Sequence, residues 1–141
     1  MRKTLKPEDL GDLLDRPILA ILSTNFADGT TLLSPLWHEW RDGGFNIVVW
    51  SQDIKSRHLQ RNPRATILVA EHDIPYRGME VRGETEITVN AEVQELALRL
   101  ATRYLGIDQG KAYADENKDI AFDLIRLEPG RLRAWDFNDE W

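Results

Sequence analysis

The sequence predicts a mainly β fold of the α+β class, in which about six to seven antiparallel strands form a barrel accompanied by two to four helices. Three observations support this prediction. Short apolar or alternating segments recur along the chain, Asp-Gly and Gly-Gly pairs separate several of them, and a stretch near residues 90–106 has strong helical periodicity. Many short strands joined by glycine-rich turns are typical of a barrel.

Length, charge and composition narrow the class of protein. The chain has 141 residues, so we expect residues 1–141 to form a single domain. The net charge of −6 argues against general nucleic-acid binding, which leaves a basic footprint. The absence of cysteine excludes disulfides, thiolate chemistry and cysteine-ligated zinc. We expect a cytoplasmic protein, because the first residues lack an apolar signal stretch and no apolar run approaches the roughly 20 residues of a membrane span.

The first part of the chain predicts a short helix and then an antiparallel meander. Proline suits the first turn of a helix, and an apolar face follows it, so a helix is expected from Pro7 to Asp15. A continuous apolar run predicts a buried strand over Pro17–Ser23, and Asp28-Gly29 predicts a hairpin turn after it. The next two expected strands are Thr31–Trp40 and Phe45–Trp50.

The rest of the chain mixes helices and strands. A short helix is expected over Asp53–Arg61, followed by strands over Thr66–Ala70 and Met79–Val89, the second of which alternates polar and apolar residues. Asn90 is the expected N-cap of an amphipathic helix that ends at Gly106. The last expected elements are a short helix over Gln109–Asn117 and strands over Phe122–Leu127 and Leu132–Phe137.

The segment Trp50–Arg57, where a strand passes into a helix, is the best candidate for a binding site. The start of a helix offers free backbone N–H groups and a partial positive charge, which attract phosphate. Ser51 adds a hydroxyl donor, and Lys55 and Arg57 add two positive charges. The same pattern is also typical of a helix face whose cations are solvated by water, so the pattern alone leaves both interpretations open.

The continuation of this segment resembles a family signature. Residues 55–65, Lys-Ser-Arg-His-Leu-Gln-Arg-Asn-Pro-Arg-Ala, resemble the K-x-R-N-L-x-x-[DN]-P-R-[AV] motif of the pyridoxamine-phosphate-oxidase-like split barrels. Arg77–Gly83 resembles the family strand that ends in V-x-G, and Asn90–Gly106 and Phe122–Phe137 lie where the family has a helix and its final strands. One residue departs from the motif, since His58 stands where asparagine is usual. The resemblance implies a split β-barrel over nearly the whole chain, and it looks closest to the flavin and deazaflavin oxidoreductase branch that uses coenzyme F420.

The resemblance also implies a homodimer with two cofactor sites in the groove between its barrels. Lys55 matches the position that contacts the cofactor phosphate. Ser51, Ser56 and Arg57 are the expected helpers at that phosphate.

The ring system of the cofactor is expected between two neighbouring strands. The backbone of the first strand would run along the ring, and residues of the next strand would flank it. Among the tryptophans, Trp37 is the first choice for a ring contact. The residues implied are Ser34, Pro35, Leu36 and Trp37 on the first strand, and Val48, Val49 and Trp50 on the next.

Catalytic side chains are not expected, because in such enzymes the cofactor supplies the two-electron chemistry. His38-Glu39 has the composition of an acid–base pair, but neighbours on a strand point to opposite faces, so only His38 is a candidate for the substrate side. Tyr76 and Arg77, in a loop after Pro75, are the other candidates for substrate contact, and a plain turn is the alternative. Three scattered histidines do not predict a metal site.

Several functions are compatible with this resemblance. The leading hypothesis is an F420-dependent oxidoreductase that moves a hydride between the deazaflavin and a small organic substrate. The second is an FMN-binding oxidase or reductase on the same fold. The third is a cofactor-binding or carrier protein without turnover, and a more remote one is a barrel that serves only as an interaction module. Nucleic acid and membrane are not expected partners.

Overall fold

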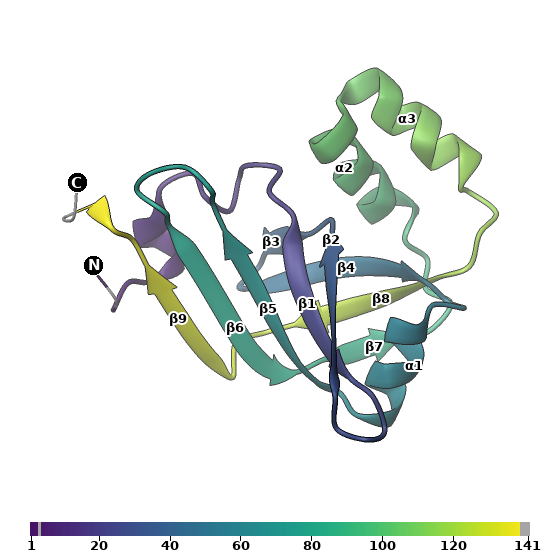
Figure 1. Cartoon of the computed structure of the whole chain (residues 1–141). Helices are drawn as coiled ribbons and strands as arrows, with labels where there is room; N and C mark the ends of the chain where they lie inside the picture. Colours follow the sequence, from purple (N-terminus) through teal and green to yellow (C-terminus); the bar gives the residue numbers. More distant parts are fainter. Residues whose placement is uncertain (3, 139–141) are drawn as a thin grey trace.

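Two antiparallel sheets form the body of the protein (Figure 1). In the computed structural model, which describes residues 1–2 and 4–138, the sheets have the strand orders β2-β1-β5-β6-β9 and β3-β4-β8-β7. Within the described residues the two sheets are not joined into a closed barrel. The expected mainly β, α+β fold class is therefore confirmed, with the barrel split into two sheets.

The chain forms nine strands and four helical segments within the described residues. The helical segments are η1 (Pro7–Leu10, a 3₁₀ helix), α1 (Ile54–Arg61), α2 (Gln94–Leu105) and α3 (Ile107–Glu116). The strands are β1 (Ala20–Asn25), β2 (Thr31–Leu36), β3 (Glu39–Arg41), β4 (Gly44–Trp50), β5 (Arg64–Ala70), β6 (Gly78–Glu84), β7 (Glu86–Thr88), β8 (Phe122–Leu127) and β9 (Arg131–Trp135).

The expected number of six to seven strands is too low, because two expected strands each break where the chain passes from one sheet to the other. The expected strand over residues 31–40 is β2 in the five-stranded sheet and β3 in the four-stranded one, with Trp37 and His38 between them. The expected strand over residues 79–89 likewise divides into β6 and β7 at Thr85, whose N–H and hydroxyl both donate to the carbonyl of Pro63 (2.8 Å each). Alternation of polar and apolar residues continues through such a corner, so the pattern does not reveal it.

Three helix predictions need adjustment. The expected N-cap Asn90 is wrong, because α2 begins only at Gln94, and Asn90 has a positive φ of 51° while its N–H donates to the buried carboxylate of Asp123. The expected helix over residues 7–15 is reduced to η1 and a series of turns. The expected helix over residues 109–117 is α3, which begins two residues earlier. Gly106 ends α2 as expected, with a φ of 89° that favours glycine.

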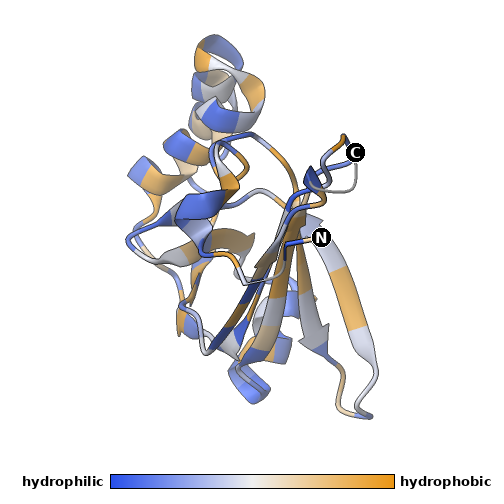
Figure 2. Ribbon diagram, turned by 90° about the vertical axis from the view of Figure 1, so that its left-hand side faces the viewer, coloured by the Kyte–Doolittle hydropathy of each residue, from blue (hydrophilic) through white to orange (hydrophobic). Residues whose placement is uncertain are grey.

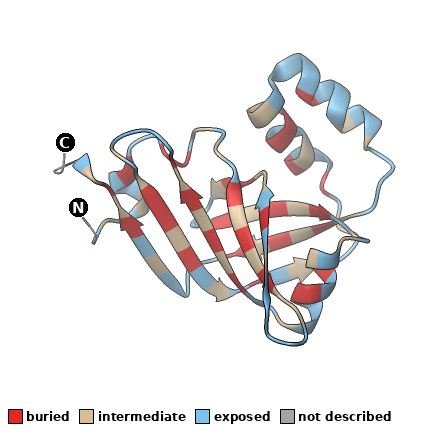
Figure 3. Ribbon diagram, in the orientation of Figure 1, coloured by how far each residue is buried: buried red, intermediate tan, exposed pale blue. Residues whose placement is uncertain are grey.

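The hydrophobic core lies between the two sheets and is closed by the N-terminal segment. Figure 3 shows buried residues alternating along the central strands, while α3 is mostly exposed and α2 has a buried side that includes Leu96, Leu100 and Ala101. Figure 2 shows apolar segments along the strands and mixed polar and apolar segments on the helices. The largest fully buried apolar side chains are Phe45, Leu10, Leu13, Leu22, Ile47, Leu59, Ile67, Met79, Ile125, Leu127 and Val69.

The helices α2 and α3 form a hairpin that stands beside the sheets rather than between them (Figure 1). The hairpin and the strands β2, β4 and β8 enclose the space described below. No helix in residues 1–2 and 4–138 is both long and apolar enough to cross a membrane.

Candidate functional site

An apolar hollow of about 280 Å³ lies where the ends of β2 and β4 meet the helical hairpin. Along β4 the side chains alternate, so Val48 faces this hollow while Val49 belongs to the core. Trp50 shares the outward side of Val48 and is 54% exposed. A contact from β4 to a bound ring would therefore come from Val48 and Trp50. The hollow is lined by Leu19, Pro35, Leu36, Trp37, Val48, Ala97, Leu100, Tyr113 and Phe122.

Trp37 forms one wall of the hollow and is held by two tyrosines. Its indole stacks on Tyr104 of α2, with ring centroids 5.2 Å apart and an interplanar angle of 5°, and it meets Tyr113 of α3 at 5.1 Å and 56°. The neighbouring residue Ser34 is buried, whereas Pro35 and Leu36 reach the hollow. The structure thus gathers most of the expected ring-binding strand around one apolar space.

The Tyr104 hydroxyl is fixed by three hydrogen-bond partners. It donates to the carbonyl of Ile18 (2.7 Å) and accepts from the N–H of His38 (3.1 Å). The Nδ1 atom of His38 lies 2.9 Å from the same oxygen. Because the single hydroxyl proton is directed to Ile18, we assign Nδ1–H as the donor in this contact.

His38 lies behind Tyr104 and not on the surface of the hollow. Its side chain is fully buried against the edge of Phe45 (5.4 Å), and its Nε2 atom has no hydrogen-bond partner in the described part of the chain. Burial, together with the positive charge of Arg103, lowers the pKa of His38 to about 4. The ring is therefore neutral at pH 7, and it is linked to the hollow through Tyr104, which stacks on the lining residue Trp37.

The phosphate candidate Lys55 lies in the first turn of α1, where Asp53 is the N-cap. The Asp53 carboxylate accepts from the backbone N–H of Lys55 (2.9 Å) and from its ammonium group (2.8 Å). Partial burial acts to raise the pKa of Asp53, but the bonds from Lys55 outweigh burial and hold this pKa below its usual value. The side chain of Arg57 is exposed and makes no ion pair or hydrogen bond to any described residue. The helix start thus carries two cations and one carboxylate.

Ser51 and Ser56 point inward, to a buried carboxylate that the sequence analysis missed. Asp123 of β8 is fully buried and accepts from Ser51 Oγ (2.5 Å), from Ser56 Oγ and from the N–H of Asn90 (2.9 Å). Burial acts to raise the pKa of Asp123, but these hydrogen bonds keep it below its usual value. One signal was present, because alternation in β8 puts Asp123 on the same buried face as Ile125.

His58, the residue that departs from the family motif, also faces inward. Its Nδ1 atom lies 2.9 Å from the hydroxyl of Thr24 on β1, and its ring meets Phe26 edge-on at 4.5 Å. The side chain is buried, and burial lowers its pKa. His58 therefore joins α1 to β1 and does not contribute a donor at the start of the helix.

Tyr76 and Arg77 lie in the loop between β5 and β6, next to the N-terminal segment. The guanidinium of Arg77 donates to both carboxylate oxygens of Glu71 (2.8 Å each) and to the carbonyl of Leu10 (2.8 Å). The ring of Tyr76 meets Phe137 at 6.4 Å. These contacts join the two ends of the chain to the sheet, and neither residue lines the hollow.

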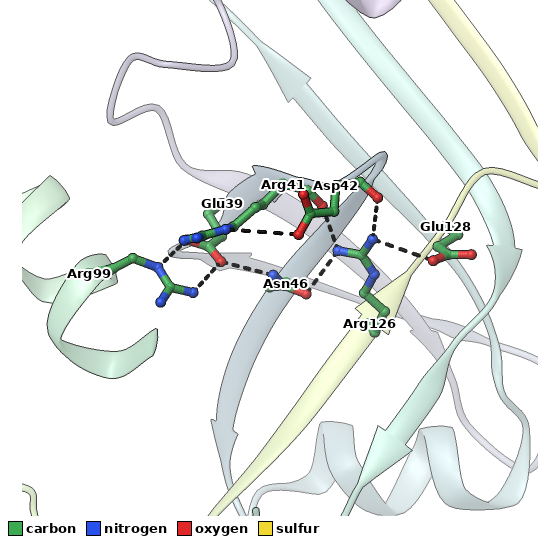
Figure 4. Close-up of polar contacts among 7 residues, drawn as sticks. All are labelled: Glu39, Arg41, Asp42, Asn46, Arg99, Arg126 and Glu128. Atoms are coloured by element: carbon green, nitrogen blue, oxygen red, sulfur yellow. Dashed lines mark hydrogen bonds and ion pairs between the residues drawn. The ribbon is translucent and has the colours of Figure 1, made fainter. Parts of the chain in front are cut away.

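A polar network fixes α2, and with it one wall of the hollow (Figure 4). Arg99 of α2 donates through Nη2 and Nε to the two oxygens of the Glu39 carboxylate on β3 (2.9 and 3.1 Å). Asn46 on β4 also donates to Glu39 (2.8 Å) and accepts from Arg126 on β8 (3.1 Å). Burial acts to raise the pKa of Glu39, and the bonds from Arg99 and Asn46 outweigh it and lower this pKa. The network ties the helical hairpin to three strands of the four-stranded sheet.

In residues 1–2 and 4–138, no group of three histidine, aspartate or glutamate side chains is arranged to hold a metal ion. The candidate site thus consists of an apolar aromatic hollow at one end of β4 and a cationic helix start that follows the same strand.

Comparison with known proteins gives a family match and many solved structures of similar fold. Residues 7–136 match the family described as pyridoxamine 5'-phosphate oxidase. An F420 reductase structure has a TM-score of 0.72 and 29% sequence identity, with coverage of 90% of this chain and 98% of that one. No protein with curated function matches the sequence.

Two further structures show similarity of fold alone. The conserved hypothetical protein Rv2991 from Mycobacterium tuberculosis has a TM-score of 0.78 and 24% identity, over 97% of this chain and 88% of that one. The heme storage protein HutZ from Vibrio cholerae has a TM-score of 0.68 and 16% identity, over 89% and 92% of the two chains.

Proposed function

Since this chain belongs to the pyridoxamine 5'-phosphate oxidase family of flavin-binding oxidoreductases, we propose that it binds a phosphate-bearing deazaflavin, coenzyme F420, and transfers a hydride to or from a small organic substrate. The proposal rests chiefly on one observation. The hollow contains Pro35, Leu36 and Trp37 together with Val48 of β4, and the same strand β4 leads into the helix start that carries Lys55. A cofactor in which a short chain joins a flat apolar ring to a phosphate would thus have the hollow as the partner of its ring and Lys55 as the partner of its phosphate.

The chemistry of the two ends fits such a cofactor. The hollow is apolar and aromatic, which suits one face of a tricyclic ring. Lys55 has an ammonium with three donors and one described carboxylate partner, so a phosphate there would receive charge-assisted hydrogen bonds, and the exposed guanidinium of Arg57, two residues on, adds positive charge to the same helix turn. Ser51 and Ser56 would act indirectly, because their hydroxyls hold the helix start to Asp123.

The bound cofactor would supply the two-electron chemistry. The residues of this chain would bind and orient it: Trp37, braced by Tyr104, would fix the ring plane, and Lys55 would hold the phosphate. The apolar lining would keep water away from the reacting face. No side chain in the hollow is assigned a proton transfer.

The choice of F420 over FMN is supported by the F420 reductase at 29% identity, whose fold covers almost the whole of both chains. FMN is the alternative cofactor on the same fold. A carrier protein without turnover is the alternative outside enzymes.

We also propose that the protein acts as a homodimer. The outer face of the five-stranded sheet carries the exposed Leu33 (64%) and the half-buried Ile21 and Leu68, which are cross-strand neighbours. A partner on this face would cover apolar surface and close the groove near the cofactor. Light scattering coupled to gel filtration measures the mass directly.

Cofactor binding is the first test of this function. The protein as purified should be colourless and should quench F420 fluorescence on titration, with a dissociation constant in the micromolar range or below. FMN should bind more weakly. Lys55→Ala should weaken F420 binding by about 10- to 100-fold, because a hydrogen bond to a charged group contributes about 1.5–3 kcal/mol.

Lys6→Ala is the charge-matched control, since Lys6 is exposed just before η1 and lines neither the hollow nor the helix start, so it should leave F420 affinity within about twofold. A yellow protein that releases FMN would show that FMN, the alternative cofactor, is the one bound. Failure of both cofactors to bind at micromolar concentration would rule out both the F420-dependent and the FMN-dependent enzyme. Tight F420 binding without hydride transfer to any acceptor would instead indicate a carrier.

A further inference from the structure

A second and larger hollow, of about 430 Å³, lies between α2 and α3. It has the size of a small-molecule site and a mainly apolar lining. None of the residues singled out by sequence contributes to it. It is lined by Val93, Gln94, Ala97, Leu98, Thr102, Ile107, Lys111, Tyr113, Ala114, Asp115, Asn117, Lys118 and Phe122.

Gly110 explains why the two helices part to form this hollow. A β-carbon at Gly110 would lie 2.6 Å from the backbone nitrogen of Thr102, so the helices touch at this point, close to the turn between them. Away from the turn the lining includes small side chains, Ala97 on α2 and Ala114 on α3, which leave space between the helices. The hollow is thus a product of the packing of the hairpin.

This second hollow adjoins the ring hollow described above. The two share Ala97 of α2, Tyr113 of α3 and Phe122 at the start of β8. Tyr113 also touches the indole of Trp37. A molecule that occupies the space between the helices can therefore extend to the wall where the cofactor ring would lie.

The polar groups of the second hollow favour an anion. Lys111 and Lys118 are exposed, and neither forms an ion pair with any described residue. Asp115, which lies between the two lysines in the sequence, is the one carboxylate among the described residues that line the hollow, so the three charges sum to one positive charge. An anionic head group can bind at this rim while an apolar body lies against Leu98 and Phe122.

We infer that the space between α2 and α3 binds the apolar body of an organic carboxylate, with Lys111 and Lys118 at its anionic end. Its role as the substrate subsite rests on the proposed function, because only then does the adjoining ring hollow hold the redox cofactor. Binding of the carboxylate itself needs no cofactor.

The test uses two probes on the full-length protein without cofactor. The first is the fluorescent apolar anion 1-anilinonaphthalene-8-sulfonate, and the second is dodecanoate, which should displace it. Ala114→Trp fills the hollow and should weaken both probes by at least about tenfold, since the bulk removes the apolar contact area. Ala112→Trp is the matched control, because Ala112 is exposed on the same helix outside the hollow and should leave binding unchanged.

The anionic end has its own test. The double variant Lys111→Gln/Lys118→Gln should weaken dodecanoate by about threefold and leave dodecanol unchanged, because exposed charges contribute modestly. Leu98→Asp provides a second disruption of the hollow if Ala114→Trp does not fold, and Leu105→Asp, on the same helix outside the lining, is its control.

The outcomes separate this inference from the proposed function. Loss of F420 binding in Lys55→Ala with probe binding intact supports both. Probe binding without any F420 binding retains the anion site and overturns its role as a substrate subsite. Equal probe affinity in Ala114→Trp and Ala112→Trp overturns the site. Absence of probe binding, with a change of oligomeric mass in Leu98→Asp, overturns it in favour of a second copy of the chain at this surface.

Discussion

The phenol ring of Tyr104 lies parallel to the indole of Trp37, with centroids 5.2 Å apart and planes 5° apart. The hydroxyl of the same tyrosine is held by Ile18 and His38. The stacking surface of Trp37 is therefore fixed from behind by hydrogen bonds to the loop before β1 and to the corner between β2 and β3.

Tyr104→Phe keeps the stacked ring but removes the hydroxyl. The Ile18 carbonyl and the buried His38 Nδ1–H would lose their partner, so the free energy of unfolding should fall by about 2 kcal/mol. F420 affinity should change by less than about threefold, since the stack remains. Urea unfolding and fluorescence titration measure the two effects. Tyr113→Phe is the matched control, because its hydroxyl has no described hydrogen-bond partner, and it should leave stability unchanged; an equal loss in both variants would contradict the assignment.

The low pKa of His38 makes stability depend on pH. The folded protein binds a proton at His38 only near pH 4, because burial lowers the pKa, whereas the unfolded chain binds it near the usual histidine pKa of 6.5. Stability from the neutral ring is therefore complete above about pH 6.5 and is lost as pH falls toward 4, by about 3 kcal/mol. Urea unfolding at pH 7 and pH 4 should show this loss in the wild type and a smaller loss in His38→Gln. The same pH dependence in both proteins would show that His38 is not its source.

Asp123→Asn tests the buried carboxylate at the junction of β4, α1 and β8. The amide can accept fewer hydrogen bonds and brings two N–H donors toward the hydroxyls of Ser51 and Ser56, so stability should fall by about 2–3 kcal/mol. The helix start should loosen, and F420 affinity should fall with it. Denaturant unfolding and F420 titration are the measurements, with Asp119→Asn as an exposed control that should match the wild type. Unchanged F420 affinity despite lower stability would show that Asp123 does not position the phosphate-binding helix start.

Asp53→Asn tests competition for Lys55. Asparagine still caps α1, but it no longer neutralises the Lys55 ammonium. F420 affinity should therefore rise, by about three- to tenfold, because one competing charge is removed. The gain should disappear when Asp53→Asn is combined with Lys55→Ala. Fluorescence titration of the wild type, the two single variants and the double variant measures this. A gain that persists in the double variant would place the effect elsewhere.

Elements that depend on local pattern were predicted closely from the sequence. The expected strands over residues 45–50 and 122–127 correspond to β4 and β8, and Gly106 ends α2. The corners at Trp37-His38 and Thr85 were not predicted, because a corner is set by which sheet the chain joins next. That choice depends on partners distant in the sequence, such as Pro63 for Thr85.

Only part of the candidate site could be predicted from the sequence. Trp37 and its strand neighbours were chosen from the family resemblance, and Pro35, Leu36 and Trp37 do line one hollow in the structure. The orientation of Ser51 and Ser56 depends on Asp123, about 70 residues further on, so sequence neighbours gave no hint of it. The space between α2 and α3 depends on a close approach at Gly110, which periodicity does not report.

The two corners have a consequence for how the protein comes apart. The chain passes between the two sheets four times, from β2 to β3, from β4 through α1 to β5, from β6 to β7 and from β8 to β9, so each sheet is covalently linked to the other at several places. Neither sheet can open fully without pulling on strands of its neighbour, so both should exchange their amide hydrogens as one cooperative unit. The hairpin of α2 and α3 takes no part in these connections and is attached to the sheets chiefly by side chains such as Arg99. Its amide hydrogens should therefore exchange first. The helical wall of both hollows would then be the most readily opened part of the molecule.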